Sequence, residues 1–216
     1  MDVKAAHAFA DDRCGSIICP THRLCAEHNE LYLDSLPGRL RDLRATNFFS
    51  STHCTLDPAM LASFDEAEGF LQNLRLKVGS VVFCIRNIDP SNGVINGAKF
   101  RVVTIHPKVI ELMRIRDHMM FYVPRIRVSV VTQLFTFVRL QFPLALAHAC
   151  TIHRVQGQTL ERVVVDCRTP FFSHGQLYVA LSRATRRDGV LLLTLPEQVE
   201  MRNVVFSDFL RFTRHC

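Results

Sequence analysis

The feature that most constrains this sequence is a long β-rich stretch set between two segments that alternate strands with helices. From about residue 76 to residue 140 there is no helical period, and short β-rich runs are separated by turn signals such as Asn96-Gly97. On either side, short apolar runs at residues 16–19 and 163–167 are typical of buried strands. We therefore expect an α/β fold, with a parallel sheet flanked by helices and interrupted by a small β-rich insert.

This pattern divides the 216 residues into three segments. Residues 1–75 are the first part of the α/β domain, residues 76–140 are a small barrel or meander, and residues 141–216 are the second part of the α/β domain. Four local predictions go with it: irregular structure over residues 39–55, a helix from Asp57-Pro58 to about Phe64, one strand over residues 144–150, and one helix over residues 175–185.

Composition restricts the functional class only weakly. Apolar residues make up 48% of the chain, enough to bury a core. No apolar run approaches the roughly 20 residues of a membrane helix, and the first residues lack the apolar stretch of a secretory signal, so we expect an intracellular protein without a membrane partner. The net charge is +6, and 22 of the 26 basic residues are arginine, whose planar donors suit phosphate. The same excess also fits an ordinary solvated surface.

Four residues of types that bind zinc recur at three-residue intervals: Cys19, His22, Cys25 and His28. We predict a helix here, and on a helix of about 3.6 residues per turn such steps fan the four side chains over roughly 180°. One tetrahedral ion could not collect all four unless the helix were broken. We therefore predict no metal site, and we expect the eight cysteines to stay reduced.

Two segments carry the chemistry. The first follows the apolar run 144–150 and is dense in polar side chains around one glycine: Thr151, His153, Arg154, Gln156, Gly157 and Gln158. Ligands of open α/β sheets bind outside the carboxyl ends of the strands, and these donors suit phosphates and sugar hydroxyls. Gly157 allows the backbone to turn or to approach a ligand closely. A strand-to-helix loop with a polar cap is the alternative interpretation.

The second segment is the predicted helix at residues 175–185. Gln176 and Arg183 are seven positions apart, so a helix would place them on one face, with the small residues Val179 and Ala180 between them. An arginine so placed can stabilise charge on a transferring phosphoryl group. A surface arginine in a salt bridge is the alternative.

These two segments together resemble a known family. Residues 142–160 (FPLALAHACTIHRVQGQTL) and 172–183 (FSHGQLYVALSR) are similar to the last two motif blocks of superfamily-one DNA helicases of the PIF (petite integration frequency) family. The form HGQLYVALSR most resembles helicases of eukaryotic Helitron transposons. Residues 18–29 resemble the motif that opens the second motor domain of the family, with Asn29 as its recurring asparagine.

The resemblance implies a RecA-like second motor domain with an SH3-like insert near residues 76–140. In this family ATP lies between two RecA-like domains. Arg183 would be the arginine finger that reaches the γ-phosphate, supported by Gln176 and Tyr178, while Gly157 and Gln158 would lie on the nucleotide side. Thr151, His153, Arg154 and Gln156 would contact single-stranded DNA, and translocation would run 5′ to 3′.

The sequence departs from the family pattern in two ways. Arg154-Val155 stands where the family usually has Lys-Ser, which keeps the positive charge and removes a hydroxyl. There is also no Gly-x-x-x-x-Gly-Lys-Ser/Thr motif, and no Asp-Glu after an apolar strand to hold magnesium. We therefore expect ATP and Mg²⁺ to require a first RecA-like domain supplied in cis or in trans.

These observations lead to one hypothesis and two alternatives. The chain is expected to be the carboxy-terminal half of an ATP-dependent 5′–3′ DNA helicase that serves repair, recombination or transposon replication, and to be inactive alone. The alternatives are a non-catalytic module that binds single-stranded DNA and a degenerate transposon remnant. We expect it in the nucleus, with the mitochondrion as the second candidate.

Overall fold

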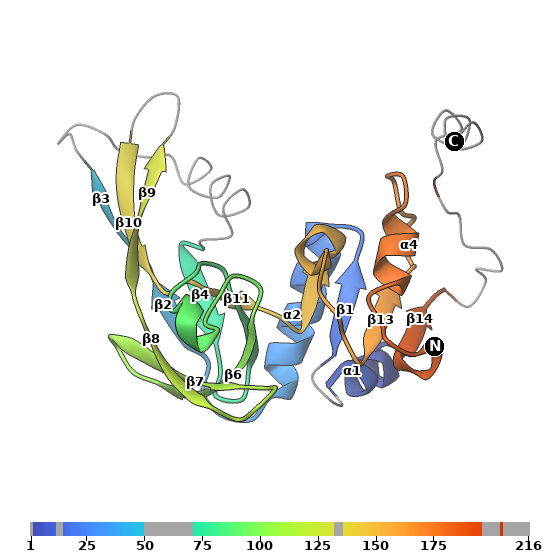
Figure 1. Cartoon of the computed structure of the whole chain (residues 1–216), viewed down its shortest axis with the longest axis horizontal. Coiled ribbons are helices and arrows are strands. Elements are labelled where there is room, and N and C mark those ends of the chain that lie inside the picture. Colours follow the sequence, from blue (N-terminus) through green and yellow to red (C-terminus); the bar gives the residue numbers. More distant parts are fainter. Residues whose placement is uncertain (1, 12–14, 50–70, 132–135, 196–203, 205–216) are drawn as a thin grey trace. The chain divides into compact units, whose positions relative to one another are not determined.

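The computed structural model describes residues 2–11, 15–49, 71–131, 136–195 and 204 (Figure 1). The chain forms two compact units. Unit 1 contains Met1–Tyr32 and His148–Cys216, and unit 2 contains Leu33–Ala147. The predicted β-rich insert at residues 76–140 lies within unit 2. Unit 2 also takes in residues 33–75, which the sequence pattern assigned to the α/β domain.

Unit 1 is built on a four-stranded sheet in the order β12-β1-β13-β14. Its strands are β1 (Ser16–Cys19), β12 (Ala149–Thr151), β13 (Val163–Asp166) and β14 (Val190–Leu193). Every neighbouring pair is parallel, and Ile17 lies opposite Ala149 on one side and Val164 on the other. β1 and β13 are buried along their whole length, as strands covered on both faces of a parallel sheet must be. The predicted parallel sheet is confirmed.

Helices α1 (Val3–Asp11), α2 (His22–Ser35) and α4 (Gln176–Leu181) accompany this sheet, with the 3₁₀ turns η3 (Ile152–Val155) and η4 (Arg187–Gly189). α1 packs on β1, β13 and β14, and α4 packs on η3 and β13. One buried cluster joins α1 and α2 to the sheet: Ala6, Ala10, Ile17, Cys19, Leu24, Cys25, Ala149, Val164 and Leu193. Small and aliphatic side chains thus make the contact of α1 and α2 with the sheet.

The described part of unit 2 consists mainly of antiparallel strands. A five-stranded sheet has the order β11-β5-β6-β7-β8, a three-stranded sheet the order β3-β10-β9, and β2 pairs with β4. The bounds are β2 Arg41–Arg44, β3 Thr46–Phe49, β4 Asn73–Leu76, β5 Val81–Cys84, β6 Lys99–Ile105, β7 Val109–Arg114, β8 Met120–Pro124, β9 Ile126–Val131, β10 Thr136–Gln141 and β11 Leu144–Leu146, with the 3₁₀ turn η2 at Pro90–Asn92. The β-rich texture is confirmed, while the closed SH3-like form stays a prediction.

Two local predictions can be compared with these elements, and a third cannot. Residues 39–55 were expected to be irregular, but β2 and β3 form there because their partners β4 and β10 come from later in the chain. The strand predicted over residues 144–150 is two strands: Ala147 donates its N–H to Val81 in unit 2, while the next residue, His148, accepts from Ile17 in unit 1. The helix predicted from Asp57 to Phe64 lies outside the described residues.

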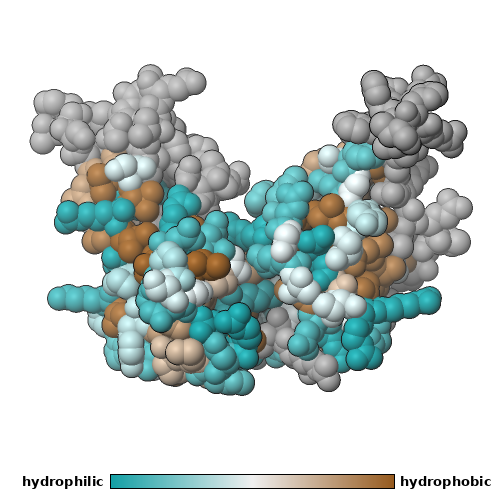
Figure 2. All heavy atoms as spheres, viewed as in Figure 1, coloured by the Kyte–Doolittle hydropathy of each residue, from teal (hydrophilic) through white to brown (hydrophobic). Residues whose placement is uncertain are grey.

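The described part of the chain contains no helix long and apolar enough to cross a membrane. On the face that Figure 2 displays, hydrophilic residues cover much of the surface of each unit, and hydrophobic residues form smaller patches between them.

Candidate functional site

The polar segment after β12 forms a compact turn at the carboxyl edge of the parallel sheet. Its 3₁₀ helix η3 has about three residues per turn, so Ile152 and Val155 fall on one side, and both are buried. His153 and Gln156 are exposed, and Arg154 is partly exposed. The valine that replaces the family's serine therefore anchors the turn, and the polar side chains around it face outward.

Gly157 and Gln158 close this turn. Gly157 has a φ of +79°, and a Cβ there would meet nothing within 4 Å. The glycine is needed for the left-handed backbone rather than for space. Gln158 donates from Nε2 to the carbonyl of Arg154 at 3.0 Å, and its backbone N–H donates to Val155 at 3.0 Å. These bonds fix the shape of residues 151–158, which we name the η3 loop.

Arg183 lies against the η3 loop. Its NH1 donates to the carbonyl of Gln158 at 3.3 Å, and its Nε donates to the carbonyl of Val179 at 3.0 Å. A backbone hydrogen bond also holds Arg183 beside the chain that follows the η3 loop, because the N–H of Leu160 donates to the carbonyl of Arg183 at 2.9 Å. The structure therefore brings together Gly157, Gln158 and Arg183, three of the residues predicted on the nucleotide side.

Gln176 and Tyr178 occupy different surroundings. The helix α4 ends at Leu181, and Arg183 lies in the turn beyond it, so the predicted sharing of one helix face with Gln176 is wrong. The helix is shorter than predicted because the chain after Ser182 pairs with Leu160. Gln176 is buried, and its Oε1 accepts the N–H groups of Phe172 and Ser173, both at 3.2 Å. It shapes the loop before α4, while Tyr178 is 71% exposed.

Asn29 holds the strand that leads into the η3 loop. Its Oδ1 accepts the N–H of Ala149 at 2.9 Å, and its Nδ2 donates to the carbonyl of the same residue at 3.0 Å. β12 is the edge strand of the sheet, so these groups of Ala149 have no strand to pair with on that side. The asparagine side chain takes the place of the missing strand and ties α2 to β12.

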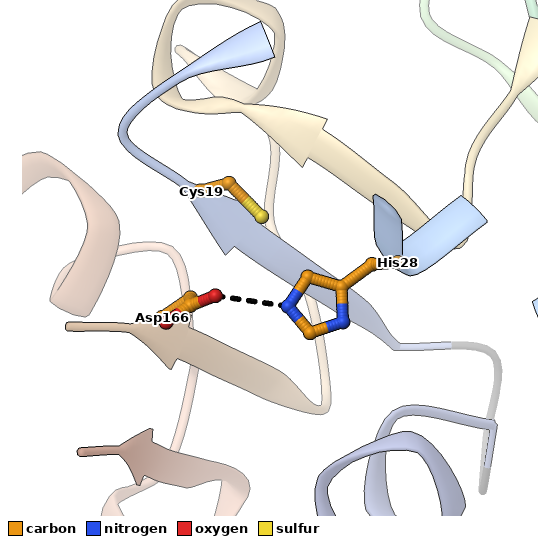
Figure 3. A group of neighbouring side chains, drawn as sticks. All are labelled: Cys19, His28 and Asp166. Carbon is orange, nitrogen blue, oxygen red and sulfur yellow. Dashed lines mark hydrogen bonds and ion pairs between the residues drawn. The ribbon is translucent and has the colours of Figure 1, made fainter. Parts of the chain in front are cut away.

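Sequence reasoning missed a second cluster at the same edge of the sheet. Cys19, His28 and Asp166 come from the end of β1, from α2 and from the end of β13, and all three are buried (Figure 3). Their potential ligand atoms all lie within 4.8 Å of one another. Cys19 belongs to the strand and not to the helix, so the geometric argument against a metal does not apply to it. His22, by contrast, is exposed and stands outside the cluster.

A chain of hydrogen bonds runs into this cluster. His148 Nε2 lies 3.1 Å from His7 Nδ1, His7 Nε2 lies 2.8 Å from His28 Nδ1, and His28 Nε2 lies 2.9 Å from Asp166 Oδ2. All three bonds form if each imidazole carries its proton on Nε2 and donates to the next group. Burial is the main cause that lowers the pKa of His7 to about 4, and the neighbouring His28 and Arg168 side chains lower it further.

Arg168 completes the electrostatics of the cluster. Its NH2 lies 2.7 Å from Asp166 Oδ2 and 3.1 Å from His28 Nε2, and its Nε donates to Asp166 Oδ1 at 3.0 Å. Burial opposes ionisation of Asp166, but the hydrogen bonds from His28 and Arg168 outweigh it and hold the pKa of this carboxyl well below its usual range. A hydrogen bond with Cys25, burial and the nearby Asp166 raise the pKa of the Cys19 thiol.

Comparison with known proteins identifies the family. The sequence model described as DNA helicase Pif1, 2B domain, matches residues 67–105. The chain is 32% identical over 188 residues to the ATP-dependent DNA helicase PIF1 of Danio rerio, covering 81% of this chain and 26% of the relative. It is 34% identical over 184 residues to the human protein of the same name, covering 79% and 27%. The chain thus spans about a quarter of the length of these relatives.

Solved structures agree on the fold. The crystal structure of Pif1 helicase from Candida albicans superposes with a TM-score of 0.73 at 23% identity, covering 93% of this chain and 49% of that one. The crystal structure of Bacteroides Pif1 bound to single-stranded DNA gives a TM-score of 0.63 at 23% identity, covering 93% and 45%. By sequence and by fold, this chain belongs to the Pif1 family of DNA helicases.

Proposed function

We propose that this chain is the second RecA-like motor domain, with its β-rich insert, of an ATP-dependent 5′–3′ DNA helicase. The observation that carries the proposal is the contact between Arg183 and the carbonyl of Gln158. It joins the two sequence blocks that resemble the family's last two motifs. The block that contains Arg183 would contact the nucleotide, and the block that contains the η3 loop would contact DNA. A movement of the Arg183 side chain would therefore reach the η3 loop through this hydrogen bond.

On the DNA side, Thr151, His153, Arg154 and Gln156 would meet the backbone of single-stranded DNA. The support is their position at the carboxyl edge of the sheet and the outward direction that η3 imposes on the polar residues. The related Bacteroides Pif1 is described bound to single-stranded DNA. Because a motor must step along any base order, we expect phosphate contacts and little sequence preference.

On the nucleotide side, Arg183 would act as the arginine finger. An arginine finger stabilises the charge that develops on the transferring phosphoryl group. Its guanidinium now donates to backbone carbonyls, which a γ-phosphate would replace as the stronger acceptor. ATP and Mg²⁺ would be held mainly by a first RecA-like domain in cis or in trans, because this sequence has no P-loop.

The proposal is tested on the DNA side by fluorescence anisotropy with a labelled oligothymidylate over a range of salt concentrations. On single strands the slope of log affinity against log salt changes by about 0.7 for each phosphate contact. Arg154→Ala should weaken binding equally on all sequences and lower the slope by about that amount. The matched control is Arg187→Ala, an exposed arginine before β14 at the opposite, amino-terminal edge of the sheet.

If wild type and Arg154→Ala have equal salt slopes and substitutions in unit 2 abolish binding, the DNA site does not lie at the η3 loop.

The second candidate function is a non-catalytic module that binds single-stranded DNA. It is supported by the polar side chains of the η3 loop, whose exposed His153 and Gln156 could meet DNA without a bound nucleotide. Combining the chain with a P-loop-containing first motor domain separates the two candidates, since only the helicase proposal predicts ATP turnover that depends on Arg183.

A further inference from the structure

We propose that Cys19, His28 and Asp166 form a binding site for one divalent transition-metal ion of the zinc class. This site uses no residue of the η3 loop, although Cys19 pairs with Thr151 at the start of that loop, and it does not rest on the helicase proposal. The side chains of His28 and Asp166 are 1% and 0% exposed, and Cys19 is 0% exposed. A thiol, an imidazole and a carboxyl whose ligand atoms lie within 4.8 Å of one another are three ligand types that zinc accepts together.

The three ligands sit on a rigid frame. Cys19 and Asp166 are the last residues of β1 and β13, which are paired neighbours in the sheet, and His28 comes from α2 above them (Figure 3). Cys25, one helical turn before His28, is buried, and its interaction with Cys19 raises the pKa of the Cys19 thiol. Cys25 is therefore the nearest candidate for a fourth ligand, which a tetrahedral zinc site needs.

The surroundings of His28 match those of a metal-binding histidine. Such a histidine uses one ring nitrogen for the metal and donates from the other to a nearby acceptor. If Nε2 of His28 binds the ion, Nδ1 carries the proton and faces His7 Nε2 at 2.8 Å. His7 Nδ1 then donates to His148 Nε2, 3.1 Å away. The same three imidazoles thus satisfy their hydrogen bonds in either direction.

Arg168 shows that this position stabilises a cation. Its NH2 lies 2.7 Å from Asp166 Oδ2 and 3.1 Å from His28 Nε2, the two atoms that would bind the ion. The Arg168 side chain is 25% exposed, so its end can withdraw towards solvent. Asp166 Oδ1 would keep its bond from the backbone N–H of Arg168, 3.1 Å long. Metal and guanidinium therefore compete for one place.

Cobalt(II) titration of the chelator-treated, reduced chain tests the proposal. Wild type should bind one equivalent, with a thiolate-to-cobalt charge-transfer band and visible bands of tetrahedral intensity, and zinc should displace it. Cys19→Ser should lose the charge-transfer band. His28→Gln should weaken binding by at least about tenfold. The matched control is Cys84→Ser, which removes a buried thiol from unit 2 and should leave the spectrum unchanged.

Arg168→Gln distinguishes a metal site from a purely structural ion pair. Removal of the competing positive charge should tighten cobalt binding by at least about tenfold. This variant also decides the matter if Cys19→Ser fails to fold by circular dichroism. The proposal is overturned if wild type shows no charge-transfer band, if the band persists in folded Cys19→Ser, or if Arg168→Gln binds no more tightly than wild type.

Discussion

Replacement of Asn29 by alanine should destabilise the edge of the sheet that carries the η3 loop. The asparagine makes two hydrogen bonds to Ala149, 2.9 and 3.0 Å long, and Ala149 is 2% exposed. Each bond contributes about 1 kcal/mol net, and an unsatisfied buried backbone group costs about 1–3 kcal/mol more. Partial access of water to the emptied space recovers some of this, so we expect a loss of about 2–4 kcal/mol in the free energy of unfolding of unit 1.

The assay is urea unfolding combined with hydrogen exchange of the amides in β1 and β12. In Asn29→Ala, the amide of Ala149 should exchange much faster than in wild type, and those of unit 2 should not change. Asn92→Ala is the control, because the Nδ2 of Asn92 makes only a solvent-exposed hydrogen bond to Asp89, 2.7 Å long. Its loss should change the free energy of unfolding by no more than about 0.5 kcal/mol. A loss below about 0.5 kcal/mol in Asn29→Ala would refute the assigned role of this side chain.

Three further outcomes are expected. Gly157→Ala should lower the free energy of unfolding by about 1–2 kcal/mol and weaken binding of single-stranded DNA, because a φ of +79° is strained for alanine even where space is open. Thermal unfolding and fluorescence anisotropy measure the two effects, and a variant unchanged in both would contradict the prediction. The hydrogen bonds from Arg114 lower the pKa of Asp117 to about 2. The ion pair therefore stabilises the β7–β8 turn above about pH 4, and this stabilisation is lost as the pH falls through about 2. An Asp117 carboxyl that titrates near 4 by NMR would disprove the prediction. The purified chain should hydrolyse no ATP above background with or without DNA, because it has no P-loop lysine; turnover that Arg183→Ala abolishes would overturn that expectation.

Local patterns predicted the parts of the fold in which neighbouring residues decide the structure. The apolar runs of β1 and β13 are of this kind, as are the helix α2 and the turn at Gly157. The pairing of β2 with β4 could not be predicted, since residues 41–44 carry only one buried side chain, Leu43, and form a strand only when β4 is beside them. The split of residues 144–150 between two units is likewise set by partners distant in sequence.

The candidate site shows the same division. The family resemblance predicted that Gly157, Gln158 and Arg183 lie on the nucleotide side, and in the structure Arg183 donates to the carbonyl of Gln158, next to Gly157. The prediction that Gln176 and Arg183 share one helix face is wrong, because α4 ends at Leu181 and Gln176 turns inward, which only the structure shows. The cluster of Cys19, His28 and Asp166 was out of reach, since Asp166 lies 138 residues after His28. The sequence did offer Cys19 and His28 as zinc-type residues, but the helix expected over both led us to reject the site.

The most direct test of the central claim is a hydrogen-exchange footprint of the chain with and without a saturating oligothymidylate at low salt. We predict slower exchange in residues 151–158, at the carboxyl end of β12, and we expect Arg154→Ala to diminish this protection. Residues 187–189, at the opposite edge of the same sheet, should exchange equally in both states. Protection confined to unit 2, or no protection at all, would contradict the assignment of the η3 loop as the DNA contact.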